Sequence, residues 1–86
     1  MNLAFSSDIN KIYKKLSKKI KEKFDMRIRI FEANEFDVIL NNHKLHGEFE
    51  GCRSINITGD IRAIYKLVSR DNYYFFDLGK HSELYE

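Results

Sequence analysis

The chain is 86 residues long, which is enough for one domain with a modest hydrophobic core and too short for a second domain joined by a linker. Its single cysteine, Cys52, cannot form an internal disulfide, and no Cys/His cluster has metal-ligand spacing. The N-terminus lacks the features of a signal peptide, and no segment approaches the roughly 18 apolar residues that a membrane span needs. These features predict one soluble, cytoplasmic domain over residues 1–86, with no cofactor, no metal and no membrane association.

The charge is divided unevenly along the chain, although the net charge is only +2. Residues 1–33 carry nine Lys/Arg against four Asp/Glu, a net +5, whereas residues 34–86 carry six against nine, a net −3. A basic half of this kind can meet RNA or an acidic partner protein, and it can equally be the solvated face of a helix.

The first third of the chain has a helical pattern. Apolar residues recur at steps of three and four through residues 9–31, which is typical of an amphipathic helix with one buried stripe. The pattern predicts helix over residues 7–33, beginning at a cap supplied by Ser6 or Ser7. One straight helix of that length would exceed the roughly 30 Å expected of so small a domain, so we expect a break near Ser17, which can cap a second helix.

The rest of the chain is predicted to form a small sheet. Residues 34–50 are polar and irregular, with Asp37 as the cap of a short turn. Alternating or continuous apolar patterns then predict three strands, Arg53–Ile57, Ile61–Val68 and Tyr73–Leu78. Their connections are too short for crossovers, so the strands must pair as antiparallel hairpins, and residues 2–5 are expected to add an edge strand. The predicted fold is α+β, with two N-terminal helices packed on one face of a small antiparallel sheet.

The other face of this sheet is expected to be polar. Neighbouring residues on a strand point to opposite sides, so Ser54 and Asn56 share a face, which Arg62 joins from the next strand. Asp60 lies in the intervening hairpin and His81 follows the last strand. A charged surface of this kind can hold a phosphodiester.

Cleavage of RNA without a metal needs a base for the 2′-hydroxyl, an acid for the departing 5′-oxygen and cations for the phosphorane. His81 can act as the acid, because an imidazole titrates near neutrality, and Asp60 or His43 can act as the base. Arg62 or Arg53 can hold the phosphate. We further expect Asn56 and Lys80 to contact RNA, and Tyr85 to stack on a base or to bond the phosphate. Each of these residues also has an ordinary structural interpretation as a surface, turn or chain-end residue.

Three segments resemble the RelE/ParE superfamily of toxins from toxin-antitoxin systems, in particular its YafQ-like ribonuclease branch. They contain the ordered patterns HxLxG, DxxxIYK and GxHSxLY, and they are residues 43–53, 60–66 and 78–85. The resemblance implies a RelE-like microbial RNase fold and a toxin that enters the ribosomal A site and cuts translated mRNA. It also implies a cognate antitoxin that holds the toxin inactive in a hetero-oligomer.

The resemblance extends to single residues. His43, Asp60, His81 and Tyr85 stand at positions that contribute to activity in YafQ-like enzymes, and Arg62 matches an arginine of related RelE-like branches. Two positions, Asn56 and Asp77, depart from the pattern.

Asn56 stands where the YafQ branch usually has histidine, and Asp77 stands where arginine is common. An amide cannot transfer a proton, and a carboxylate repels phosphate. The departures keep open a catalytically weak domain that only binds an antitoxin. A ParE-like toxin that poisons DNA gyrase is a further alternative, although such relatives generally lack the terminal histidine motif.

Overall fold

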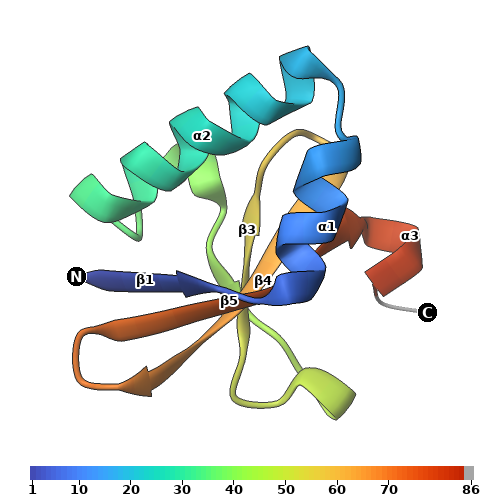
Figure 1. Cartoon of the computed structure of the whole chain (residues 1–86). Helices are drawn as coiled ribbons and strands as arrows, with labels where there is room; N and C mark the ends of the chain where they lie inside the picture. The colour runs from blue at the N-terminus through green and yellow to red at the C-terminus, as the bar shows by residue number, and fades with distance from the viewer. Residues whose placement is uncertain (85–86) are drawn as a thin grey trace.

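The computed structural model describes residues 1–84 as a five-stranded sheet with helices on one side (Figure 1). The elements in chain order are β1 (Asn2–Phe5), α1 (Ser7–Lys15), α2 (Lys18–Ala33), the 3₁₀ turn η1 (Val38–Leu40), β2 (His43–Lys44), the 3₁₀ turn η2 (Gly47–Phe49), β3 (Arg53–Asn56), β4 (Ile61–Ser69), β5 (Asn72–Lys80) and α3 (His81–Leu84). No helix among residues 1–84 is long and apolar enough to cross a membrane.

The sheet has the strand order β1-β5-β4-β3-β2. The predicted hairpins β3–β4 and β4–β5 are confirmed, as is the edge strand at the N-terminus. The prediction of an antiparallel sheet is wrong at that edge, because β1 runs parallel to β5. Short turns fix the directions of the hairpin strands, whereas β1 reaches β5 only through most of the chain, so no turn dictates its direction.

The break between the two helices is confirmed at Ser17. The Ser17 hydroxyl accepts a hydrogen bond from Ile20 N at 3.3 Å and so caps α2, while Leu16 has an extended backbone. Ser6 caps α1 in the same way, through a 3.1 Å bond from Ile9 N. Because each helix begins at its own serine cap, the apolar residues are divided between two short helices that both pack on the small sheet.

The main core lies between the helices and the sheet. Phe31 of α2 is fully buried, and its ring meets three aromatic rings of β4 and β5 edge-on at centroid distances of 5.0 to 5.5 Å, those of Tyr65, Tyr73 and Phe75. Ile55, Ala63 and Leu78 belong to the same cluster. These residues define the helix side of the sheet.

The opposite face, here called the far face, is less open than predicted. Ser54, Ile64 and Leu45 are buried but lie outside the helix-side cluster, and the Phe49 ring stands 6.5 Å from that of Phe76. The loop between β2 and β3 therefore covers the middle of the far face. The expectation that Ser54 is presented to a ligand is wrong, because its side chain has no exposed area.

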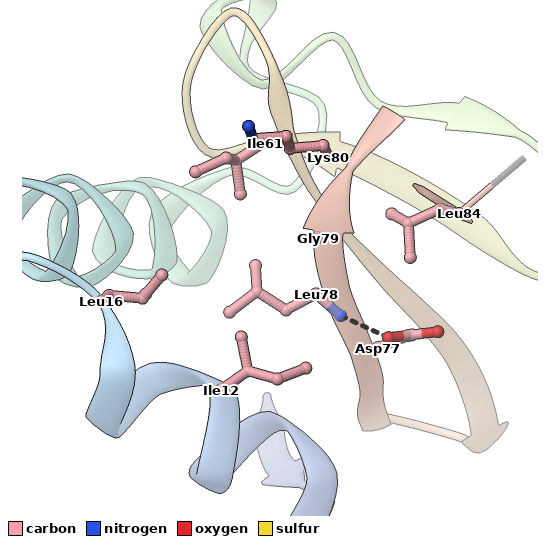
Figure 2. A pocket seen from close by; sticks show the side chains of 8 residues that line it. All are labelled: Ile12, Leu16, Ile61, Asp77, Leu78, Gly79, Lys80 and Leu84. Carbon is pink, nitrogen blue, oxygen red and sulfur yellow. Dashed lines mark hydrogen bonds between the residues drawn. The ribbon is translucent and has the colours of Figure 1, made fainter. Parts of the chain in front are cut away.

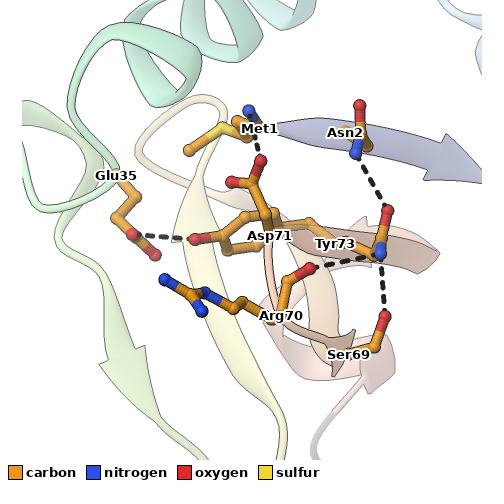
Figure 3. Close-up of polar contacts among 8 residues, drawn as sticks. Met1, Asn2, Glu35, Ser69, Arg70, Asp71 and Tyr73 are labelled. Atoms are coloured by element: carbon orange, nitrogen blue, oxygen red, sulfur yellow. Dashed lines mark hydrogen bonds and ion pairs between the residues drawn. The ribbon is translucent and has the colours of Figure 1, made fainter.

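Polar contacts tie the N-terminus to the β4–β5 turn (Figure 3). The Met1 amino group lies 3.0 Å from an Asp71 carboxylate oxygen, and Asn2 Nδ2 donates to Asn72 Oδ1 at 3.1 Å. Asn72 Nδ2 in turn donates to Ser69 Oγ and to the carbonyl of Arg70. Asp71 has φ 65, a left-handed conformation that aspartate tolerates better than most residues. These contacts define where the hairpin turns and hence how β4 and β5 are aligned.

Candidate functional site

Two predicted site residues from different segments meet at one end of the sheet. The backbone N–H of His81, the first residue of α3, donates to the carbonyl of Asp60 at 3.1 Å. This contact arises because β4 begins where β5 ends, so that Ile61 lies opposite Lys80. The side chains of Asp60, Lys80 and His81 are all exposed. These three residues thus lie at the same end of the sheet, and their side chains are open to solvent.

Arg62 completes this cluster from the far face. Its Nη1 donates to the carbonyls of Gly59 at 2.9 Å and Thr58 at 3.3 Å, so the guanidinium folds back over the β3–β4 turn that carries Asp60. Within residues 1–84 these are its hydrogen bonds, which leaves several of its five N–H donors for a ligand. The side chain is half-buried, so its charge is presented in a fixed direction. We call Asp60, Arg62, Lys80 and His81 the turn cluster.

Asn56 lies beside the turn cluster and directly opposite Arg62 in the β3–β4 register. Its side-chain oxygen is buried and makes no hydrogen bond within residues 1–84, while its backbone carbonyl accepts a 3.0 Å bond from Arg27 Nη1. A buried amide oxygen without a donor costs free energy, which a ligand hydroxyl or N–H can offset. Because this oxygen has almost no accessible surface, a ligand can reach it only after the Asn56 side chain rotates.

His43 is on the far face but apart from the turn cluster. It pairs with Ser54 across β2 and β3, and β2 lies two strands from β4, roughly 10 Å at ordinary strand spacing. Its Nδ1 lies 2.8 Å from the carbonyl of Asn41. Because a carbonyl can only accept, Nδ1 is the donor in this contact, which leaves Nε2 as the acceptor of a neutral ring.

Arg53 lies on the helix side, away from the turn cluster. Its Nε donates to Asn42 Oδ1 at 2.7 Å, and its guanidinium stands 5.3 Å from the centre of the Phe36 ring. Asn42 Nδ2 donates to the buried hydroxyl of Tyr65 at 2.7 Å. Burial raises the pKa of Tyr65, and the hydrogen bond from Asn42 lowers it in part. The structure thus uses Arg53 to connect a loop to the core. Neighbouring residues of β3 point to opposite sides of the sheet, so Arg53 lies on the side opposite Ser54 and Asn56.

A groove of about 400 Å³ runs beside the end of β5 (Figure 2). It opens where β1 has ended, between α1 and α3, and its walls are mainly apolar, with Ile12, Leu16, Leu78 and Leu84 among them. Asp77 and Lys80 also line it. One oxygen of the half-buried Asp77 carboxylate accepts the N–H of Leu78 at 2.9 Å, so part of its hydrogen-bonding capacity is used within the strand. The groove lies next to His81, the first residue of α3.

Aromatic residues on the far face were missed at the sequence level. The rings of Tyr74 and Phe76 stack at 6.1 Å, and the ammonium of Lys66 stands 5.9 Å from the centre of the Phe76 ring. A shift of register between Ile64 and Tyr65 turns Phe75 to the core and Phe76 to the far face. No sequence pattern marks this shift.

Tyr85, the remaining predicted site residue, lies outside the described residues 1–84. No group of metal-ligating side chains occurs among the described residues.

A family model described as "Bacterial toxin of type II toxin-antitoxin system, YafQ" matches residues 1–86. The chain belongs to this family. It is a toxin of the type II toxin-antitoxin class, as the HxLxG, DxxxIYK and GxHSxLY patterns predicted. Comparison with curated protein sequences gives no match.

Solved structures with the same fold include members of this family and of a neighbouring one. The YoeB/ParE toxin from Agrobacterium tumefaciens has a TM-score of 0.75 at 21% identity, covering 94% of this chain and 99% of that one. YafQ from E. coli strain BL21(DE3) has a TM-score of 0.70 at 21% identity, covering 99% and 98%. The E. coli DinJ-YafQ toxin-antitoxin complex matches with a TM-score of 0.68 at 24% identity, covering 99% and 97%. At these identities the likenesses show a shared fold.

Proposed function

We propose that this YafQ-family toxin is a ribosome-dependent endoribonuclease that cuts translated mRNA by metal-independent transphosphorylation. In that reaction a base removes the proton of a ribose 2′-hydroxyl, the 2′-oxygen bonds to the adjacent phosphorus, and the bond to the 5′-oxygen breaks. An acid protonates the departing 5′-oxygen, so the products are a 2′,3′-cyclic phosphate and a 5′-hydroxyl. The observation that carries the proposal is the contact between His81 and Asp60 beside Arg62.

In this proposal the turn cluster supplies the reacting groups. His81 is the acid, Arg62 stabilises the charge of the phosphorane, and Lys80 adds a second cation. Asp60 is the favoured base, because a backbone hydrogen bond of 3.1 Å joins it to His81. His43 is the alternative base, and its acceptor Nε2 suits the role, but it lies farther from the acid.

Asn56 and Asp77 are proposed to lower the rate rather than to abolish it. After its side chain rotates, the now buried amide oxygen of Asn56 can accept a hydrogen bond from the 2′-hydroxyl and orient it, although it cannot carry the proton away. The Asp77 carboxylate already accepts one hydrogen bond from its own strand, and it lines the groove beside the turn cluster. If these substitutions do abolish cleavage, the chain is a domain that binds an antitoxin only.

Bases of the mRNA are proposed to stack along β5. Tyr74 and Phe76 form the aromatic surface, and Lys66 adds a positive charge over the ring of Phe76. Phe76 is four residues from Lys80, which is roughly 13 Å along a strand and suits one or two nucleotides. Stacking of this kind tolerates many sequences.

The partners proposed for this chain follow the family. The DinJ-YafQ structure is a toxin-antitoxin complex, and we infer that a cognate antitoxin binds and silences this chain in the same way. Its other partners are the ribosome and the mRNA, which places its action in the cytoplasm. A gyrase-poisoning activity has no feature of the described residues in its favour.

The test is cleavage of a translated message by purified protein, read by primer extension. His81→Ala is expected to lower cleavage by about 100-fold or more, which is typical for loss of a general acid. His46→Ala is the matched control, because His46 is an exposed histidine of the β2–β3 loop outside the turn cluster. A His81→Ala protein that cuts like the parent would refute the role of His81, and absence of cleavage by the parent would leave the antitoxin-binding alternative.

A further inference from the structure

Four large apolar side chains are exposed on α2 and in the loop that follows it. Within residues 1–84 they make up most of the large apolar side chains that are well exposed: Val38 at 92%, Met26 and Phe36 at 60% each, and Ile39 at 47%. Here they are called the α2–η1 surface. A cluster of this kind on a small domain indicates a place where another molecule binds.

The α2–η1 surface is held in a fixed shape. Asp37 caps η1 through a 3.0 Å hydrogen bond from Ile39 N, and Leu40 at the end of η1 is fully buried. Arg27 Nη1 on α2 donates to the carbonyl of Ile39 at 3.1 Å and to that of Asn56 at 3.0 Å. Figure 1 shows η1, in light green, lying against α2. Val38 is therefore presented to solvent by a turn that is fixed on both sides.

A groove of about 360 Å³ separates α2 from η1, and its chemistry specifies the occupant. Its lining includes apolar Met26 and Ile39 and is otherwise charged, with Lys19, Lys23 and Arg27 against Glu22. The whole of α2 carries six Lys/Arg and three Asp/Glu, a net +3. A groove lined by apolar and mainly cationic side chains fits a segment that is itself amphipathic and acidic.

Two other occupants fit less well. A second copy of this chain would bring a similar positive charge to the same place, which opposes association. RNA would use the lysines but would gain nothing from exposed Val38 and Ile39, whose burial favours an apolar partner. The groove also lies on the helix side, whereas the proposed RNA surface is the far face.

We propose that the α2–η1 surface is the docking site for an acidic amphipathic segment of the antitoxin. The identity of this partner rests on the proposed function, but the site does not depend on the chain cutting RNA. The segment places apolar side chains on Met26, Val38 and Ile39 and carboxylates against the lysines of α2. In this proposal the antitoxin that inhibits the toxin also binds a surface remote from the turn cluster.

The test uses the antitoxin encoded beside the gene for this chain, produced as pure protein and titrated by calorimetry. Val38→Asp is expected to weaken the complex by about tenfold or more, since it removes an apolar contact and adds a charge that repels the acidic segment. Lys23→Glu is expected to weaken it in the same direction. Leu67→Asp is the matched control, because Leu67 is a 57% exposed apolar residue on β4, away from the groove, and should leave affinity within about twofold.

Hydrogen exchange of the parent complex gives an independent reading that needs no variant. Amides of η1 and of α2 around Met26 are expected to become protected when the antitoxin binds. The proposal is overturned if Val38→Asp and Lys23→Glu bind the antitoxin like the parent, or if they bind it normally but lose binding to ribosomes, which would make the surface an RNA site. A parent that never cuts RNA but shows the expected affinities would refute the endoribonuclease and leave the docking site standing.

Discussion

Substitutions of Arg53 and Arg62 should have different effects, because the two side chains have different neighbours in the structure. Loss of Arg53 should lower stability, and loss of Arg62 should lower cleavage. Arg53→Ala removes a 2.7 Å bond from a charged donor to Asn42 and the stacking of a guanidinium over Phe36. A hydrogen bond to a charged group contributes about 1.5 to 3 kcal/mol, and a partly exposed cation–π contact contributes about 0.5 to 1 kcal/mol. The expected loss of stability is therefore about 2 to 4 kcal/mol.

Urea unfolding followed by circular dichroism measures this loss. With a slope of about 1 kcal/mol per molar urea, typical of a small domain, the midpoint of Arg53→Ala should fall by about 2 M or more. Arg53→Lys keeps the charge but not the planar donor fork, so its midpoint should lie between those of the parent and of the alanine variant. Cleavage by folded Arg53→Ala at low temperature should remain close to that of the parent.

Arg62→Ala should behave in the opposite way. Its side chain bonds only the carbonyls of the β3–β4 turn within residues 1–84, so the change in midpoint should be small. Cleavage should fall by about 100-fold, as is typical when one preorganised charge for the transition state is lost. If Arg53→Ala instead lost cleavage with an unchanged urea midpoint, the assignment of Arg53 to the fold would be refuted.

Three other changes test the structure more briefly. Ser17→Ala should cost about 1 kcal/mol in thermal or urea unfolding through loss of the α2 cap, whereas Ser7→Ala, which removes no capping side chain, should be nearly neutral. Burial raises the pKa of Tyr65 above its ordinary 10.0, so the folded state keeps this proton to higher pH than the unfolded state does. The contribution to stability should be full below pH 10 and should fall as the pH rises through and above 10. Tyr65→Phe should make the stability depend less on pH in this range. Asn56→His should raise cleavage in the primer-extension assay by about tenfold or more, because an imidazole there can transfer a proton, and an unchanged rate would count against a site at that position.

The sequence was a reliable guide where a local pattern decides the outcome. Serine caps and an apolar stripe were enough to place the break at Ser17, and alternation together with short turns gave the two hairpins. It could not give β2 and α3, which have only two and four residues and so show no period. It also missed the register shift beside Tyr65, which decides that Phe76 rather than Phe75 faces outward. That shift depends on how the strands pack.

The same distinction holds for the site. Asp60, Arg62 and His81 were recognised one by one, but their meeting depends on the pairing of Ile61 with Lys80, which no single segment encodes. His43 was recognised too, and only the strand order shows that it lies two strands away from β4. The charge of Arg53 suggested a phosphate ligand, but the structure places this residue on the helix side, away from the turn cluster.

The geometry of the turn cluster is set far from the cluster itself. Asp60 and His81 meet only if β4 and β5 are aligned so that Ile61 lies opposite Lys80, and that alignment depends on the turn at the other end of the hairpin and on the two register shifts between them. A slip of one residue would move His81 by roughly 3.3 Å and turn alternate side chains to the wrong face. The left-handed conformation of Asp71, its ion pair with the N-terminus and the hydrogen bonds of Asn72 oppose that slip. Residues remote from the proposed RNA surface thus contribute to bringing the proposed acid and base together.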